Sequence, residues 1–351
     1  MPNGAERVLR HSQASPRRLV TIAPEAQLSE AHGLMRRYGV HHLLVSDRDR
    51  IVGIVSDRDI AHRLGPAAAR GVANRHEEEA MQRRVLQVAH FTLITVPAAA
   101  PVEEAAALII ERGISALPVR DADGAIVGIV TTRDLLRGML IQSGNDAAMA
   151  LAEFVGGSVE QFVVEMNAAA KKLGMKNSQW RNPHGLPARE HYTSARDLAR
   201  LAKAIIAEFP EYYRLYSERE FSYHGIKQQN RNQLLWRDPS VDGMKTGFTA
   251  AAGYCLVSSA ARDGMRLIAV VLGAENPRLR NDGAKKLLDY GFANYETRKV
   301  YSAGQQVEAA PVTGGDAEFA GVGPAADIFV TIPRGGYALL KASFGRLQSL
   351  V

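Results

Sequence analysis

The chain has 351 residues, of which 46% are hydrophobic and 23% charged, and its formal net charge is +6. This balance predicts a soluble globular protein with room for two domains and argues against a disordered chain. Basic residues alternate with acidic ones, as in SDRDR, so we expect no nucleic-acid partner. The single cysteine, Cys255, excludes an internal disulfide and a cysteine-based metal cluster, and we predict no metal site.

The sequence shows no recognisable targeting or membrane-spanning segment. The N-terminal stretch MPNGAERVLRHSQASPRRLV carries positive charges, but it has no apolar core and no small-residue cleavage site. No run of 18 apolar residues occurs anywhere in the sequence. We therefore expect a cytoplasmic protein without a transmembrane segment.

The N-terminal part of the chain contains an internal repeat. The segment that begins at Thr21 returns 74 residues later at Thr95, and IVGIVSDRDI at residues 51–60 returns as IVGIVTTRDL at residues 126–135. Each copy predicts a short strand, an amphipathic helix, two apolar strands and a second helix.

The rest of the chain predicts a second, mixed α/β module. No lysine precedes Lys171, which fits two modules of separate origin. Helices are expected within residues 143–157, 159–174 and 195–209, the last of them with Ser194 as its N-cap. Strands are expected near residues 244–249, 254–263 and 265–274.

The repeat resembles a CBS domain pair. The resemblance rests on GVHHLLV with IVGIVSDRD and on GISALPV with DGAIVGIVTTRD, and it covers residues 17–136, with copies at about 17–62 and 91–136. It implies two βαββα copies that pack sheet to sheet and leave clefts for adenosine-bearing ligands such as AMP, ADP, ATP or S-adenosylmethionine. No cofactor is required, and a homodimer through the CBS modules is expected.

The same resemblance implies which residues contact an adenine nucleotide. Backbone groups of the segment that starts at Gly113 hold the base, Thr131 or Thr132 contacts phosphate, and Asp134 accepts hydrogen bonds from ribose. The candidates in the first copy are Ser56, Asp57 and Asp59. The alternative is a pair that only dimerises, because a helix cap and a phosphate contact need the same chemistry at a helix N-terminus.

The second module resembles the serine D-alanyl-D-alanine carboxypeptidases of peptidase family S11, the low-molecular-mass penicillin-binding proteins. The resemblance rests on SGN, NRNQLLW, KTG and TIPRGGYALLKASF, and it covers more than half of the chain. The family trims peptidoglycan pentapeptides through an acyl-enzyme, and β-lactams acylate the same serine. The implied fold is α/β throughout: a truncated penicillin-binding-protein or β-lactamase-like domain at 137–300 follows the CBS pair, and a C-terminal β domain begins at 301–351.

Three sequence elements carry the family's chemistry. These are a serine activated by a lysine one helical turn away, a Ser/Asn pair that shuttles protons, and a Lys-Thr-Gly strand that holds the substrate carboxylate. Ser143 and Asn145 match the second element, and Lys245, Thr246 and Gly247 match the third.

Two arginines match supporting positions of the family, Arg231 in NRN and Arg280 in RLRNDGAKKLL. For both of them an ordinary surface charge is an equal alternative.

The first element is missing, because no serine in the sequence has a lysine three residues later. The tripeptide at residues 134–136 fits both the end of a CBS copy and the approach to SGN, which indicates a recombination or splice there. Three hypotheses follow: a regulatory or vestigial member of the carboxypeptidase family, a working peptidase in which Ser143 attacks with Lys245 as base, and a purely nucleotide-binding or scaffold protein.

The strands at 254–263 and 265–274 are apolar almost throughout, which is typical of strands covered on both faces. We expect an exposed apolar patch beside Ser143 and the KTG strand, an open groove in place of a closed active site, and a tendency to aggregate or dimerise through this patch. We also expect the CBS helices to have little apolar surface left to cover the second module.

Overall fold

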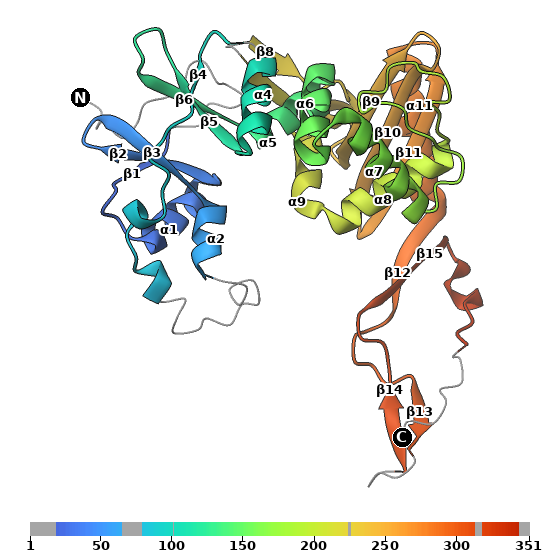
Figure 1. Ribbon diagram of the computed structural model, residues 1–351. Coiled ribbons are helices and arrows are strands. Elements are labelled where there is room, and N and C mark those ends of the chain that lie inside the picture. Colours follow the sequence, from blue (N-terminus) through green and yellow to red (C-terminus); the bar gives the residue numbers. More distant parts are fainter. Residues whose placement is uncertain (1–18, 65–78, 101, 224–225, 313–317, 344–351) are drawn as a thin grey trace. The chain divides into compact units, whose positions relative to one another are not determined.

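The structure is a computed structural model that describes residues 19–64, 79–100, 102–223, 226–312 and 318–343 (Figure 1). The chain divides into two compact units. The first comprises Met1–Lys172, Ser178–Tyr192 and Glu218–Arg231, and the second comprises Leu173–Asn177, Thr193–Ser217 and Asn232–Val351. Residues 137–172, which follow the repeat, thus lie in the same unit as the repeat.

The first copy of the repeat forms a small sheet with a helix on it. Its elements are β1 (Thr21–Ile22), α1 (Leu28–Tyr38), β2 (His42–Asp47), β3 (Arg50–Ser56) and α2 (Asp57–Leu64). The strand order is β1-β2-β3, with β1 parallel and β3 antiparallel to β2. Helix α1 buries Leu28, Ala31 and Met35 because these apolar residues recur at helical spacing. Val85 of the short helix η2 (Val85–Gln87) joins the same core.

The second copy repeats this arrangement and confirms the predicted βαββα order. Its elements are β4 (Val96–Pro97), α4 (Val102–Arg112), β5 (Ala116–Arg120), β6 (Ile126–Thr131) and α5 (Thr132–Arg137). The order β4-β5-β6 has the same strand directions as the first copy. Apolar residues of both copies pack into one cluster: Leu19, Leu44, Ile51, Ile54, Ile126, Val127 and Ile129. The two copies therefore meet through their sheets, as predicted.

The rest of the first unit packs directly on the second copy. It contains the π-helix η3 (Gly138–Gln142), α6 (Asn145–Gly156), α7 (Val159–Lys172), and the hairpin strands β7 (Glu220–Tyr223) and β8 (Ile226–Gln229). Helix α6 lies against α4, and Ala150 is buried in the same cluster as Ala105 and Ile109 (Figure 1). The expectation that the CBS helices have little apolar surface left to cover the second module is therefore wrong for α4, which packs against α6.

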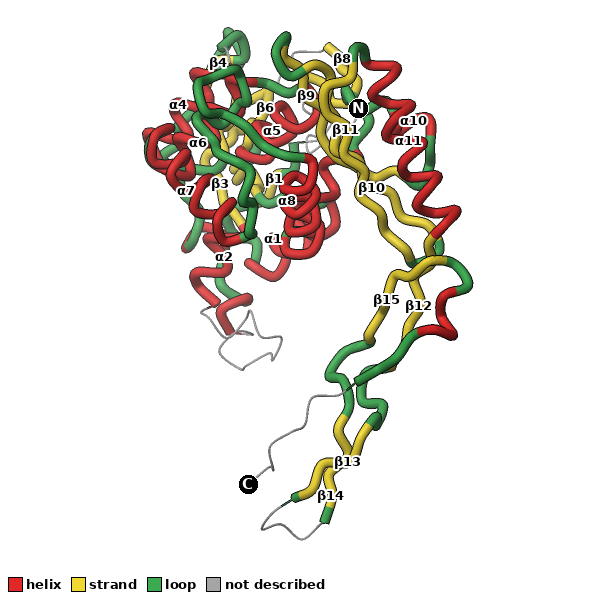
Figure 2. The backbone as a smooth tube through the Cα atoms, turned by 90° about the vertical axis from the view of Figure 1, so that its right-hand side faces the viewer, coloured by secondary structure: helices red, strands yellow, loops and turns green. Residues whose placement is uncertain are grey.

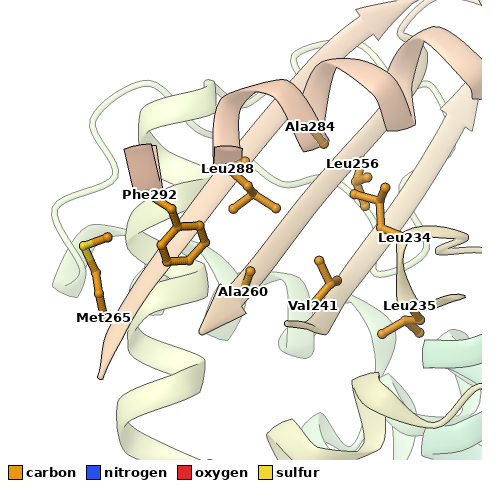
Figure 3. Close-up of a cluster of buried hydrophobic side chains, with 10 residues drawn as sticks. Leu234, Leu235, Val241, Leu256, Ala260, Met265, Ala284, Leu288 and Phe292 are labelled. Atoms are coloured by element: carbon orange, nitrogen blue, oxygen red, sulfur yellow. The ribbon is translucent and has the colours of Figure 1, made fainter. Parts of the chain in front are cut away.

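The second unit is built on an antiparallel sheet with one helix on each face. Its main elements are α8 (Ala195–Glu208), α9 (Pro210–Tyr213), η4 (Arg214–Ser217), α10 (Leu234–Arg237), β9 (Val241–Thr249), β10 (Gly253–Arg262), β11 (Met265–Ala274) and α11 (Pro277–Asn294). The strand order is β11-β10-β9. Figure 2 shows this sheet with α8 on one side and α11 on the other. Leu288 and Phe292 of α11 point at one face of the sheet, toward Leu256 and Ala260 (Figure 3).

Helix α8 covers the other face of this sheet. Its Ala202 packs with Met244 of β9 and Ile268 of β11. The helix begins as predicted, because Ser194 accepts a hydrogen bond at its Oγ from the amide of Asp197 at 3.2 Å.

Coverage of strand β11 is incomplete. Ile268 and Val270 are only partly buried, and Leu272 is 40% exposed. These residues lie on β11, at the opposite edge of the sheet from the KTG strand β9, so the exposed apolar patch expected beside Ser143 and the KTG strand stays a prediction.

The C-terminal residues of the second unit form two small antiparallel sheets. One pairs β12 (Tyr295–Tyr301) with β15 (Ile328–Pro333), the other pairs β13 (Glu308–Pro311) with β14 (Phe319–Val322), and the turn η5 (Gly336–Leu339) follows. Within the described ranges, no single helix has the length and apolarity needed to cross a membrane. Helices α6 and α7 would satisfy both criteria only as a pair, and they are bent by 83° where they join.

Candidate functional site

The nucleotide-binding candidates lie at the starts of helices α2 and α5, where they form matching capping boxes. The hydroxyl and the amide of Ser56 both donate to Asp59 Oδ2 at 2.7 Å. In the second copy, the Thr131 hydroxyl donates to Asp134 Oδ2 at 2.8 Å and its amide at 3.0 Å. The capping role that the sequence left open is therefore filled in both copies.

The second carboxylate oxygen of each aspartate also has a partner. Asp59 Oδ1 lies 3.1 Å from His90 Nε2, and Asp134 Oδ1 accepts from Arg137 Nη1 at 3.3 Å. Burial alone would raise the pKa of Asp59, but hydrogen bonds from Ser56 and the nearby His90 hold that pKa below its ordinary value. A ribose hydroxyl at either aspartate would share or replace these internal partners.

The two helix starts meet at His41, at the contact between the copies. His41 Nδ1 lies 2.6 Å from Asp57 Oδ2 of α2, and Arg133 Nη1 of α5 donates to His41 Nε2 at 3.0 Å. Because Nε2 is the acceptor, Nδ1 carries the proton and donates to Asp57. The Nε of Arg133 is buried without a hydrogen-bond partner among the described residues. A guanidinium donor therefore remains available where the copies meet.

Gly113 occupies a position that a side chain would strain. Its φ is +62°, and Gly39, its counterpart 74 residues earlier, has φ +61°. Each residue ends the long helix of its copy in the left-handed conformation. Equivalent backbone hydrogen bonds hold the first residues of α2 and α5. The Asp57 amide donates to His41 O at 3.0 Å, and the Thr132 amide donates to Ser115 O at 3.1 Å.

His42 makes a buried polar contact between the copies. Its Nε2 lies 2.9 Å from Ser115 Oγ. Burial lowers the pKa of His42 to about 4, and the nearby Asp57 only partly opposes this effect. His42 is therefore neutral in the folded protein across the physiological pH range.

We expect acid to weaken the first unit through His42. The unfolded side chain takes up a proton below pH 6.5 while the folded one stays neutral until about pH 4, so the stabilisation is complete above pH 6.5 and is lost as the pH falls through this window. At about 1.4 kcal/mol per pKa unit, the loss reaches about 3 kcal/mol. Urea unfolding of wild type and of His42→Gln from pH 7 to pH 4 measures it. Parallel pH profiles for the two proteins would contradict the assignment.

The SGN segment forms a tight turn between η3 and α6. Ser143 has φ +60°, and the Gly144 amide donates to Gly138 O at 3.1 Å. A Cβ on Gly144 would lie 2.7 Å from Asp146 Oδ1, so a larger residue there would require the exposed Asp146 side chain to move. Asn145 is exposed at the first position of α6.

Arg231 supports this turn from the β7–β8 hairpin. Its Nε donates to Gln142 O at 2.8 Å, and Gln142 Nε2 donates to Gln229 O at 2.8 Å. The Arg231 side chain is exposed, but it does more than an unattached surface charge, because it holds the carbonyl that precedes Ser143.

The KTG segment lies on β9, at the edge of its sheet. Thr246 is buried and Gly247 exposed, and Lys245 Nζ donates to Thr246 O at 2.8 Å. Strand β10 pairs with one side of β9 only, with Thr246 opposite Leu256. The other side of the strand has no strand partner within the described residues.

Arg280 is not a surface charge, since only 6% of it is exposed. Its Nε and Nη2 donate to Asn281 Oδ1 at 3.2 and 3.1 Å, and burial lowers the pKa of its guanidinium. Helix α11 thus holds a cation near Tyr254 and Cys255, the residues of β10 that pair with the KTG strand next to its exposed end.

The start of β9 is held by residues that the sequence did not single out. Asp242 accepts from Tyr213 Oη at 2.6 Å and from both terminal nitrogens of Arg266 at 2.7 and 2.8 Å. Asn232 and Ser258 both donate to Gly243 O. Only Asn232 lies in a recognisable motif, NRN, so the others had no signal in the sequence.

The candidates form three groups: the CBS candidates, the SGN residues with Arg231, and residues 245–247 with Arg280. The first two groups belong to the first unit, and the third belongs to the second unit. Within the described part of the chain, no three His, Cys, Asp or Glu side chains are arranged to hold a metal ion.

Known families match three parts of the chain. The CBS domain matches residues 15–65 and 79–141, D-alanyl-D-alanine carboxypeptidase matches 111–276, and the C-terminal domain of penicillin-binding protein 5 matches 295–350. The first two matches overlap over residues 111–141, which include the tripeptide that fits both families.

Individual relatives agree with the family matches. D-alanyl-D-alanine carboxypeptidase DacA of Haemophilus influenzae is 46% identical over 217 residues, which is 61% of this chain and 55% of the relative. DacC of Escherichia coli is 45% identical over 234 residues, 66% of this chain and 57% of the relative. The chain thus spans little more than half the length of these relatives.

Solved structures show the same similarity. Penicillin binding protein 5 from Haemophilus influenzae has a TM-score of 0.56 at 45% identity, over 61% of this chain and 63% of that one. Penicillin binding protein 6B from Escherichia coli has a TM-score of 0.52 at 39% identity, over 62% of this chain and 63% of that one.

Proposed function

Since this chain joins a CBS domain region to a region of the D-alanyl-D-alanine carboxypeptidase family, we propose that it is a nucleotide-binding regulatory protein whose carboxypeptidase part does not acylate. One observation carries the proposal: the SGN turn and the KTG strand are both formed, yet no serine in the sequence has a lysine three residues later. Acylation by this family needs that pair, because the lysine activates the serine.

The carboxypeptidase part keeps groups that can recognise a peptide without cutting it. Within the described residues, one side of strand β9 has no strand partner, so an extended peptide can pair with it there, and we assign Lys245 and Thr246 to the peptide's carboxylate. A peptidoglycan peptide or a β-lactam would then bind reversibly. Fluorescent-penicillin labelling tests this part: a covalent band that Ser143→Ala abolishes would favour the working peptidase instead.

The contact between the CBS copies supplies chemistry for an adenine nucleotide. Two helix starts converge there, and the buried Nε of Arg133 offers a donor to an anion. AMP, ADP, ATP and S-adenosylmethionine are the ligand candidates, and titration calorimetry with each distinguishes them. The proposal includes a homodimer through the CBS modules, which sedimentation velocity tests.

We expect Asp134→Ala to weaken nucleotide binding by about 1–3 kcal/mol, a factor of about 5 to 150, because a charge-assisted hydrogen bond to ribose is lost. Calorimetry with ATP measures the change. Glu111→Ala is the control, since Glu111 is an exposed residue of the same copy, and it should leave the affinity unchanged. Equal affinities of wild type and Asp134→Ala would remove Asp134 from the site.

A further inference from the structure

Arg137 forms a buried ion pair at the last turn of α5. Only 3% of the residue is exposed. Its Nε and Nη2 donate to the two carboxylate oxygens of Glu218 at 2.8 and 2.9 Å, and its Nη1 donates to Asp134 Oδ1 at 3.3 Å. Such a bidentate contact fixes the orientation of the guanidinium and carboxylate groups as well as the distance between them, and a lysine cannot form it.

One side of Arg137 leads to the nucleotide candidate site. Asp134 Oδ2 accepts hydrogen bonds from the amide and hydroxyl of Thr131 at the start of α5, and Asp134 Oδ1 accepts one from Arg137. A ligand that donates a hydrogen bond to Asp134 Oδ1 therefore competes directly with Arg137.

The other side of Arg137 leads to the SGN turn. The backbone carbonyl of Glu218 accepts from Asn230 Nδ2 at 2.9 Å, which ties Glu218 to the far end of the β7–β8 hairpin. The hairpin and the residue that follows it contact the residues just before Ser143. Phe221 packs on buried Ile141, and Arg231 Nε donates to Gln142 O at 2.8 Å. The intervening segment is the π-helix η3, an irregular turn of the kind found at functional sites.

We propose that Arg137 is a positioning residue that couples the start of α5 to the SGN turn. When Asp134 holds Arg137, the guanidinium keeps Glu218 and its hairpin in the register that fixes Gln142. When a ligand binds Asp134 in place of Arg137, Arg137 shifts toward Glu218. The contacts of the hairpin with Ile141 and Gln142 then change. The ligand-driven half of this inference rests on the proposed nucleotide site, and the coupling itself does not.

Hydrogen exchange of the full chain, read by mass spectrometry on peptides that cover residues 138–147, tests the coupling. Glu218→Gln should speed exchange there by about 100-fold, because it removes the carboxylate with the two shorter contacts and leaves the buried guanidinium only the 3.3 Å contact with Asp134 described above. Glu220→Gln is the matched control: Glu220 lies in the same hairpin and pairs with Lys227 at 2.7 Å, but this ion pair is exposed. It should leave the exchange unchanged.

A double-mutant cycle separates coupling from a structural role. Asp134→Asn should change exchange at residues 138–147 in the wild-type background and have no further effect in the Glu218→Gln background. Additive effects would overturn the inference. A peptide from β2 and β3 reports overall folding. If Glu218→Gln unfolds that region, Arg137→Lys replaces Glu218→Gln in the cycle. This variant keeps the positive charge but cannot form the bidentate contact with Glu218.

Adding ATP separates this inference from the proposed function. Heat of binding together with altered exchange at residues 138–147 supports both. Binding without altered exchange overturns the ligand-driven coupling and leaves the nucleotide site standing. If no heat of binding is seen, the proposed nucleotide site fails, and the double-mutant cycle still decides whether Arg137 couples the two segments.

Discussion

Peptides that end in D-alanyl-D-alanine are expected to release no D-alanine when incubated with this protein. A serine and its base act as one unit, and removing the nucleophile in a comparable serine hydrolase lowers the rate by about 10⁶. Lys245 cannot stand in for the missing base without leaving Thr246 O, to which its Nζ donates.

Release of D-alanine is measured with a coupled amino-acid oxidase assay. The Haemophilus influenzae relative serves as the active control, and Ser143→Ala serves as the blank. Turnover above the Ser143→Ala background would make the working-peptidase hypothesis correct and the regulatory proposal wrong.

Leu256→Ala is expected to lower the free energy of unfolding of the second unit by about 2–5 kcal/mol. Leu256 is 1% exposed, stands opposite Thr246 of the KTG strand, and lies in the core with Leu288 (Figure 3). Truncation therefore leaves a cavity directly behind the KTG segment. The measurement is urea unfolding of the full chain, followed by a probe in the second unit.

Leu272→Ala is the matched control for this change. It removes the same atoms from the neighbouring strand β11, at a residue that is 40% exposed, so it should lower stability by less than about 1 kcal/mol. Equal losses for the two variants would mean that Leu272 is covered and that the exposed end of β11 does not exist in solution.

The internal repeat was sufficient to predict most of the fold of the first unit. Once a segment returns 74 residues later with the same apolar spacing, a common βαββα order and sheet-to-sheet packing follow, and both are observed. The packing of α6 on α4 did not follow, because periodicity tells which face of a helix is apolar and says nothing about which element covers it.

The site was predictable where its residues are close in sequence. Ser143 to Asn145 and Lys245 to Gly247 were recognisable as short motifs, and the helix starts at Asp57 and Thr132 followed from capping chemistry. The pairing of Arg137 with Glu218 spans 81 residues and has no local signature. The burial of Arg280 could not be predicted from the sequence either, because an arginine in a helix is usually a surface residue and the sequence does not show which elements cover it.

The central claim is that this chain keeps the recognition motifs of a carboxypeptidase without its acylation chemistry, and intact-protein mass spectrometry after incubation with benzylpenicillin tests it most directly. The account predicts one unmodified mass for the wild type, while the Haemophilus influenzae relative gains one penicilloyl group under the same conditions. A stoichiometric adduct on the wild type that Ser143→Ala abolishes would contradict it.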